Sequence, residues 1–217
     1  MALEIDNFDI DYHFASPVFR FSKPEFLNSV KTVFEDFTNR VKYDKKPNDP
    51  YPGVMTELIS GDDRIEDFLK YISDISWDVL NKQGYNMDLF YTDASEMWGQ
   101  YHPRTSSMEK HSHGHGTYLT GFYFLDTPDD SSTMFIHDPR SVKVHSGLPT
   151  RGGADLTLAH NYVFYKPTQG DLIFTNSWLE HSFTRNASNY PYKFIHINIK
   201  VVPRQNISSE DAAPIVI

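Results

Sequence analysis

The sequence predicts an α+β fold, mainly β, because two amphipathic helical segments precede a long run of short strand segments. The 217-residue chain is long enough for one domain with a substantial core and leaves little room for two. Hydrophobic residues make up 39% and aromatic residues 15% of it, which is typical of a packed globular protein. We therefore expect a single domain over residues 1–217, with helical support at about 22–84, a β core at about 85–202 and a tail at 203–217.

The helical support is predicted from two segments with apolar residues at helical spacing. Residues 18–21 are expected to form an opening strand, after which Ser22, Pro24 and Glu25 give an N-terminal helix signal that leads into an apolar stripe ending at Val41. A loop with three prolines follows at 45–53, and a second helix is expected over about 62–82, ended by Gly84. Both helices are expected to pack on one face of a β-sandwich.

The β core is predicted from a change of periodicity at Met87, where alternating strand-like segments bounded by turn residues begin. The expected strands cover residues 87–101, 118–125, 133–137, 162–166, 172–176 and 193–202. Residues 212–217 fit either a loose tail or a covering strand.

Charge and composition exclude several classes of function. The net charge of −9 would repel phosphate backbones, so we expect no general nucleic-acid binding. The chain has no cysteine, which excludes disulfides, thiolate catalysis and cysteine-based zinc sites. The acidic beginning lacks the features of a signal peptide, and no apolar run approaches the length of a membrane span. We expect a cytoplasmic protein without a membrane partner.

A histidine-rich segment is the most informative feature of the sequence. His111, His113 and His115 alternate with serine and glycine. Residues i and i+2 of a strand point to the same face, so neighbouring histidines of this array can direct their imidazoles to one point. Such convergence is what metal ligation needs, and His113 belongs to either choice of pair, with His111 or with His115.

A metal site built from strands needs a further ligand from a distant strand, and His181 is the candidate. It follows a turn at Pro167–Gly170, an apolar strand and a short aromatic segment. His160 lies in a polar stretch and is less suited to this role, while His102, His137, His145 and His196 are isolated in the sequence.

Five blocks of the sequence, in order, resemble small 2-oxoglutarate/Fe(II) dioxygenases of marine bacteria and their phages, which are distant relatives of the prolyl 4-hydroxylases. The first blocks are His111-Ser-His113 followed by Leu-Thr-Gly-Phe-Tyr-Phe-Leu at 119–125, and Phe-Ile-His-Asp-Pro-Arg at 135–140. The others are Lys-Pro-x-x-Gly-Asp-Leu-Ile-Phe at 166–174, Trp-Leu-x-His at 178–181, and Lys-Phe-Ile-His-Ile-Asn-Ile at 193–199. The resemblance covers about residues 85–202.

The resemblance implies a double-stranded β-helix, or jelly roll, that holds Fe(II) through His111, His113 and His181. The usual triad of this superfamily contains an aspartate or glutamate two residues after the first histidine, and here His113 stands at that place. Either His113 replaces the carboxylate, or another residue such as Asp138 supplies it. The resemblance also implies that 2-oxoglutarate is bound as cosubstrate. Its far carboxylate would be held by Lys193, with Arg140 as the alternative and Tyr123 in support.

The activity implied is hydroxylation of a C–H bond with O₂ and 2-oxoglutarate, releasing succinate and CO₂. The substrate, a small molecule or a peptide, is not indicated by the sequence, and a homodimer is left open. Residues 141–160 form a long irregular stretch that we interpret as a lid over the substrate entrance. Two alternatives remain: a three-histidine zinc hydrolase or hydratase, and a non-catalytic β-sandwich that binds a ligand without any metal.

Overall fold

The computed structural model describes residues 11, 13–44, 52–149 and 156–204. Most of the predicted tail and most of the proline-containing loop at 45–53 lie outside these residues, as does the question of a covering strand at 212–217. The helices are α1 (Leu27–Asp44) and α2 (Glu66–Lys82). The strands are β1 (Val18–Ser22), β2 (Val54–Leu58), β3 (Phe90–His102), β4 (Met108–His111), β5 (Thr117–Asp126), β6 (Met134–His137), β7 (Tyr162–Tyr165), β8 (Asp171–Asn176), β9 (His181–Phe183) and β10 (Tyr192–Pro203).

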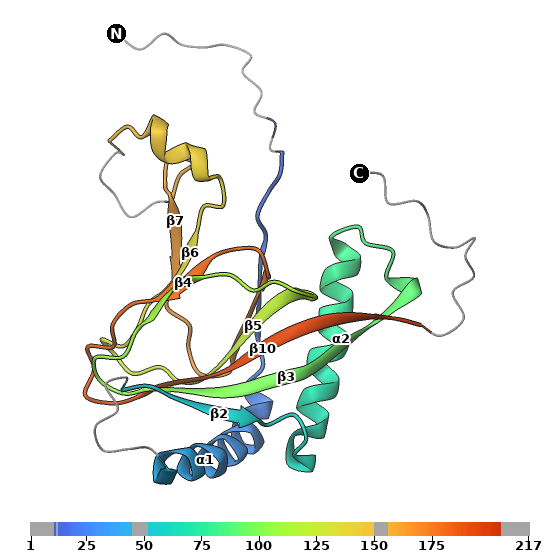
Figure 1. The fold of residues 1–217 in the computed structure, drawn as a ribbon, viewed down its shortest axis with the longest axis vertical. Helices are drawn as coiled ribbons and strands as arrows, with labels where there is room; N and C mark the ends of the chain where they lie inside the picture. Colours follow the sequence, from blue (N-terminus) through green and yellow to red (C-terminus); the bar gives the residue numbers. More distant parts are fainter. Residues whose placement is uncertain (1–10, 12, 45–51, 150–155, 205–217) are drawn as a thin grey trace.

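The strands form two antiparallel sheets. One has six strands in the order β1-β8-β5-β10-β3-β2, and the other has four in the order β4-β9-β6-β7. Strands that follow one another in the chain alternate between the two sheets through β3, β4 and β5, and again through β8, β9 and β10, as in a jelly roll. The predicted double-stranded β-helix is confirmed (Figure 1).

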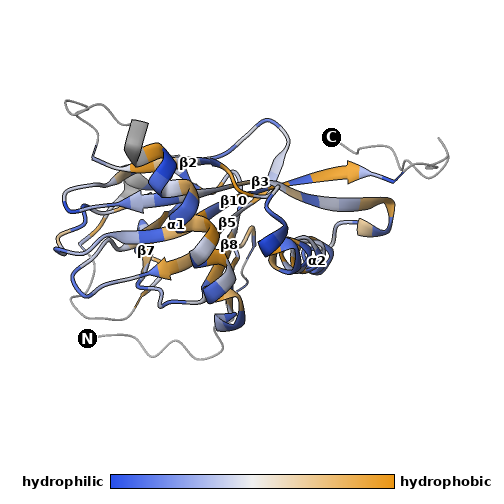
Figure 2. Ribbon diagram, turned by 90° about the horizontal axis from the view of Figure 1, so that it is seen from below, coloured by the Kyte–Doolittle hydropathy of each residue, from blue (hydrophilic) through white to orange (hydrophobic). Residues whose placement is uncertain are grey.

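The two helices cover the outer face of the six-stranded sheet, as predicted. Their apolar stripes pack against alternate residues of β3, β5, β8 and β10 in the larger hydrophobic core. Both helices carry hydrophilic residues as well as hydrophobic ones (Figure 2). Gly84 lies just past α2 with φ of +95°, a conformation that glycine adopts without strain, which confirms the expected end of this helix. Among the described residues, no helix is long and apolar enough to cross a membrane.

A second core fills the space between the two sheets and is rich in aromatic side chains. Its buried members are Phe122, Phe124, Met134, Ile136, Ile173, Leu179, Phe183, Tyr192 and Phe194. Along β10 the residues alternate between the cores: Ile195, Ile197 and Ile199 face the helices, whereas Tyr192 and Phe194 face the opposite sheet. This alternation decides which residues of β10 can reach the interior of the β-helix.

Three short strands depart from the sequence prediction. β2 was not expected, and it adds an edge to the larger sheet beside β3. β4 and β9 have only 4 and 3 residues, too few to show a clear period, yet they pair with each other. Short 3-10 turns at Pro24–Phe26 and Asp63–Ile65 precede the two helices, so the regular helices begin later than predicted.

Candidate metal centre

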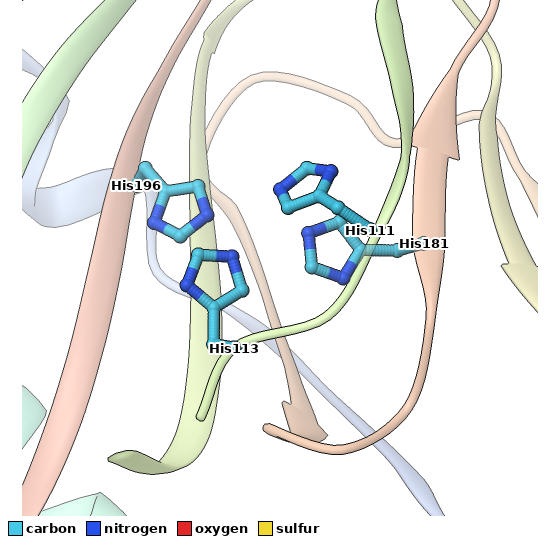
Figure 3. A group of neighbouring side chains, drawn as sticks. All are labelled: His111, His113, His181 and His196. Carbon is cyan, nitrogen blue, oxygen red and sulfur yellow. The ribbon is translucent and has the colours of Figure 1, made fainter. Parts of the chain in front are cut away.

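Four histidines from three strands and one adjoining loop converge between the two sheets. They are His111, His113, His181 and His196, and one side-chain nitrogen from each lies within 4.8 Å of the others (Figure 3). His111 ends β4, and the register pairs it with His181, the first residue of β9. His113 lies just beyond β4, and its backbone N–H donates to the carbonyl of Ser177 at 2.8 Å. His196 comes from the opposite sheet, in the middle of β10.

The imidazole rings pack closely against one another. The ring centroids of His111 and His181 are 4.4 Å apart, and those of His113 and His196 are 4.8 Å apart. His113 also lies nearly parallel to His181 at 5.3 Å. Contacts between the imidazole rings alone stabilise such a cluster little. The ring nitrogen atoms therefore need a common partner.

The hydrogen bonds of the cluster leave several nitrogens without a partner. His111 Nδ1 lies 2.7 Å from the carbonyl of Glu109, and His181 Nδ1 lies 3.3 Å from the carbonyl of Leu179. Such bonds require Nδ1–H as donor and leave the Nε2 lone pair free, as in metal-ligating histidines. The Nε2 atoms of His113 and His181, and both ring nitrogens of His196, are buried without a hydrogen-bond partner. Since a buried unpaired polar atom costs about 1–3 kcal/mol, this donor set fits a metal ion.

The surroundings keep these imidazoles neutral. Burial lowers the pKa of His181 to about 3, and the nearby His111 and His113 lower it further. Burial, together with His111, also lowers the pKa of His113 to about 4, against the opposing charge of Glu96. The pKa of His196 is lowered well below its ordinary value, chiefly by burial. Neutral imidazole is the form that binds a metal, so the site is ready for an ion at physiological pH.

Aromatic rings surround the cluster. Trp98 stacks on His196 with centroids 4.3 Å apart and an angle of 13°. Phe122 contacts His181 and His196 edge-on at 5.0 and 4.9 Å. These apolar walls exclude water from two of the four histidines, which are themselves buried.

The structure brings together the three histidines predicted as ligands. It also separates His111 from the alternative His115, which is exposed and turns away with φ of +54°. His160 lies outside the cluster and bonds to Thr157. Sequence reasoning missed His196 as a member. The available signal was the alternation along the closing strand, where His196 shares a face with residues that point into the interior.

Asp138 is not part of the cluster. One of its oxygens accepts from Arg140 Nε at 2.9 Å, and the other accepts from Arg140 and from Lys143 at 2.7 and 3.0 Å. These cations hold the pKa of Asp138 well below its usual range. With both oxygens engaged, Asp138 is bound to its own loop. Arg140, the alternative anchor for 2-oxoglutarate, is exposed and contributes to this same pair.

Lys193 and Tyr123 lie outside the histidine cluster, and their expected role in binding 2-oxoglutarate stays a prediction. The ammonium of Lys193 pairs with Glu35 of α1 at 2.5 Å and with Asp126 at 2.9 Å. Tyr123 packs in the core under the helices and donates its hydroxyl to the carbonyl of Lys23 at 2.6 Å. Both residues occupy positions that face the helices, because strand alternation places them opposite to the interior face.

A cavity of about 570 Å³ lies beside β6 and β7, and its lining does not include the four histidines. It is lined in part by Ile136 and Leu179, of which the first pairs with His181 in the sheet and the second precedes His181 by two residues. Thr157, Leu158 and His160, at the end of the predicted lid, also line it. Residues 150–155 of that stretch lie outside the described part, and the lid stays a prediction.

Comparison with known families and structures agrees with this site. The family described as "Putative 2OG-Fe(II) oxygenase" matches residues 96–193, a stretch that contains His111, His113 and His181 and ends before His196. No curated protein matches the sequence. A prolyl-4-hydroxylase from Pseudomonas putida is similar in structure, with 10% identity and a TM-score of 0.55, covering 85% of this chain and 92% of that one.

Two further solved structures share the fold. AviO1 from Streptomyces viridochromogenes Tue57 has 13% identity and a TM-score of 0.60, covering 85% of this chain and 90% of that one. The epimerase SnoN in complex with Fe³⁺, alpha ketoglutarate and nogalamycin RO has 12% identity and a TM-score of 0.57, covering 93% and 87%. The family match over residues 96–193 and the histidine cluster make the chain similar to 2-oxoglutarate/Fe(II) oxygenases, and the solved structures, a prolyl-4-hydroxylase among them, share its fold.

Proposed function

We propose that the enzyme hydroxylates a C–H bond of an organic substrate and that His111, His113 and His181 hold its Fe(II), with His196 beside them. The balanced reaction consumes the substrate, 2-oxoglutarate and O₂, and it yields the hydroxylated product, succinate and CO₂. The observation that carries the proposal is the convergence of four imidazoles, of which those of His113, His181 and His196 have ring nitrogens that are buried and unpaired. Imidazole is a suitable ligand for iron, and no competing partner occupies these atoms among the described residues.

The protein's own residues bind the ion, fix its ligands and exclude water. The carbonyls of Glu109 and Leu179 orient His111 and His181, so that the Nε2 atoms face the centre. Trp98 holds the plane of His196 by stacking. When bound, Fe(II) with 2-oxoglutarate supplies the oxidising chemistry, whereas the protein contributes position and an apolar environment.

The cavity beside Ile136 and Leu179 is the proposed approach for the substrate. It lies next to the strand that carries His181, and it is large enough for a small molecule or a peptide side chain. Its lining combines apolar residues with the rings of Tyr162 and Tyr165. A substrate bound there would place a C–H bond near the histidines without displacing the aromatic core.

Turnover in the absence of a known substrate tests the proposal. The parent enzyme, supplied with Fe(II), 2-oxoglutarate and O₂ but no other substrate, is expected to form succinate slowly. His181→Ala is expected to abolish succinate formation, and His115→Ala, outside the cluster, is expected to retain it. Equal succinate formation by the parent and His181→Ala would refute the proposed site. Zinc-dependent hydrolysis without formation of succinate would favour the hydrolase alternative instead.

A further inference from the structure

The four histidines of the cluster do not come from one side of the β-helix. His111 and His181 belong to the smaller sheet and His113 to the loop after β4, whereas His196 reaches the same point from the larger sheet (Figure 3). We propose that His196 is a fourth and exchangeable ligand, which binds the metal ion in the resting enzyme and leaves it when 2-oxoglutarate binds. This inference rests on the proposed function and adds a control of access to the metal.

The spacing of the nitrogen atoms fits direct binding by His196. Four atoms within 4.8 Å of one another share a centre about 2.9 Å or less from each, and a metal–nitrogen bond is about 2.0–2.1 Å long. Small side-chain movements therefore suffice to bring all four nitrogens to one ion. A molecule placed between the ion and His196 would need a separation of about 4 Å or more, because a hydrogen bond is then added to the metal–ligand bond.

The polar atoms of His196 have no other partner among the described residues. Both of its ring nitrogens are buried without a hydrogen bond, and the residue is 1% exposed. Each unpaired buried polar atom destabilises the fold, so an imidazole that only filled space would be a costly choice at this position. Binding a metal ion through one nitrogen gives the ring a partner that the protein itself does not offer.

Hydrogen bonds distinguish His196 from the two ligands of the smaller sheet. In His111 and in His181, Nδ1 donates to the backbone carbonyl two residues earlier in the chain. Such a bond fixes the orientation of a ligating imidazole and makes it a better ligand. His196 has no bond of this kind, and its ring is held by packing against Trp98. We therefore expect His196 to be replaced more readily than His111 or His181.

The number of positions on the ion also requires that one imidazole can leave. An octahedral ion offers six positions, and 2-oxoglutarate takes two of them when it chelates through its keto acid end. Four imidazoles together with this cosubstrate would leave no position for O₂. After displacement of His196, three imidazoles remain and one position is free. Binding of the cosubstrate and opening of the last position are then a single event.

Proton NMR of the Co(II)-loaded protein can count the ligating imidazoles. Ring N–H protons of histidines bound to this paramagnetic ion are strongly shifted, and their signals disappear in D₂O. We expect four such signals in the parent and three after 2-oxoglutarate is added. His196→Phe keeps a ring beside Trp98 but cannot bind metal, so it should show three signals in both states. His102→Phe, a matched change of a buried histidine outside the cluster, should behave as the parent does.

The affinities for metal and cosubstrate give a second readout, because they are expected to change in opposite directions. Loss of one imidazole should raise the Kd of His196→Phe for Co(II) by about tenfold or more. The Kd of the Co(II)-loaded variant for 2-oxoglutarate should fall by about threefold or more, because no protein ligand has to be displaced. A damaged fold would weaken both interactions.

The spectra of the parent decide the question even if His196→Phe does not fold. Three signals before 2-oxoglutarate is added, or four that persist after it has bound, would overturn the inference and leave the proposed function standing. A parent that binds no 2-oxoglutarate, and that forms no succinate when loaded with Fe(II), would overturn the proposed function and the inference with it.

Discussion

Acidifying the metal-free protein is predicted to destabilise it through its buried histidines. The folded-state pKa values of His113 and His181 are about 4 and about 3, against an ordinary value of 6.5. Between these values and 6.5 the unfolded chain binds more protons than the folded chain. The free energy of unfolding therefore falls as pH is lowered through 6.5, and this loss is complete only near the folded pKa values.

The size of the effect follows from the two pKa values. Between about pH 7.5 and about pH 5, each histidine lowers the free energy of unfolding by about 2 kcal/mol, so the pair lowers it by roughly 4 kcal/mol. Carboxylates with depressed pKa values, such as Asp62 at about 2, act in a different window. Their stabilisation is present above their unfolded pKa and is lost at lower pH. The decrease in the free energy of unfolding above pH 5 is therefore due to the histidines.

Urea denaturation of chelator-treated protein at the two pH values measures this loss. The variant His113→Gln/His181→Gln replaces both imidazoles by neutral groups that do not titrate. Its pH dependence is expected to be smaller than that of the parent by roughly 4 kcal/mol. Identical pH dependence in the parent and the variant would refute the view that these two histidines are neutral in the metal-free state.

Four further predictions concern metal binding, packing, and the side chains of Tyr123 and Lys193. Fe(II) at about a hundredfold excess over its Kd should raise the free energy of unfolding by about 2.7 kcal/mol, and a chelator should reverse this in the same denaturation assay. Gly121→Ala should cost about 1–3 kcal/mol, because a Cβ there would meet Phe174 at 2.5 Å, and thermal unfolding would show it. Tyr123→Phe should lose about 1 kcal/mol of stability and retain parental 2-oxoglutarate affinity, since its hydroxyl serves only the carbonyl of Lys23. Lys193→Met should lower the unfolding midpoint by leaving Glu35 and Asp126 without this partner; an unchanged midpoint would contradict the observed ion pairs.

Much of the fold could be predicted because its larger elements have clear periods. The apolar stripes of α1 and α2 and the longer strands β3, β5 and β10 were all expected near their observed places. β2, β4 and β9 have five residues or fewer and were not predicted, although β6 and β7, which are as short, were. These segments are strands because they pair with neighbouring strands of the sheets.

The site was predictable only in part, because strand register is a tertiary property. His111, His113 and His181 stand in motifs that can be recognised one at a time. His196 stands alone in the sequence, and only the pairing of β10 with β3 and β5 directs it to the other three. The same alternation turns Lys193 toward α1. A shift of one residue in register exchanges the two faces, so the motif match could not decide this point.

Anaerobic titration with Fe(II), with the bound metal counted after dialysis, tests the central claim most directly. We predict one iron bound per chain in the parent and in His115→Ala, which is adjacent in sequence but lies outside the cluster. His113→Ala and His181→Ala are each predicted to lose this stoichiometric binding while remaining folded. Iron binding at the parental level in both of these variants would contradict the assignment of the metal to the histidine cluster.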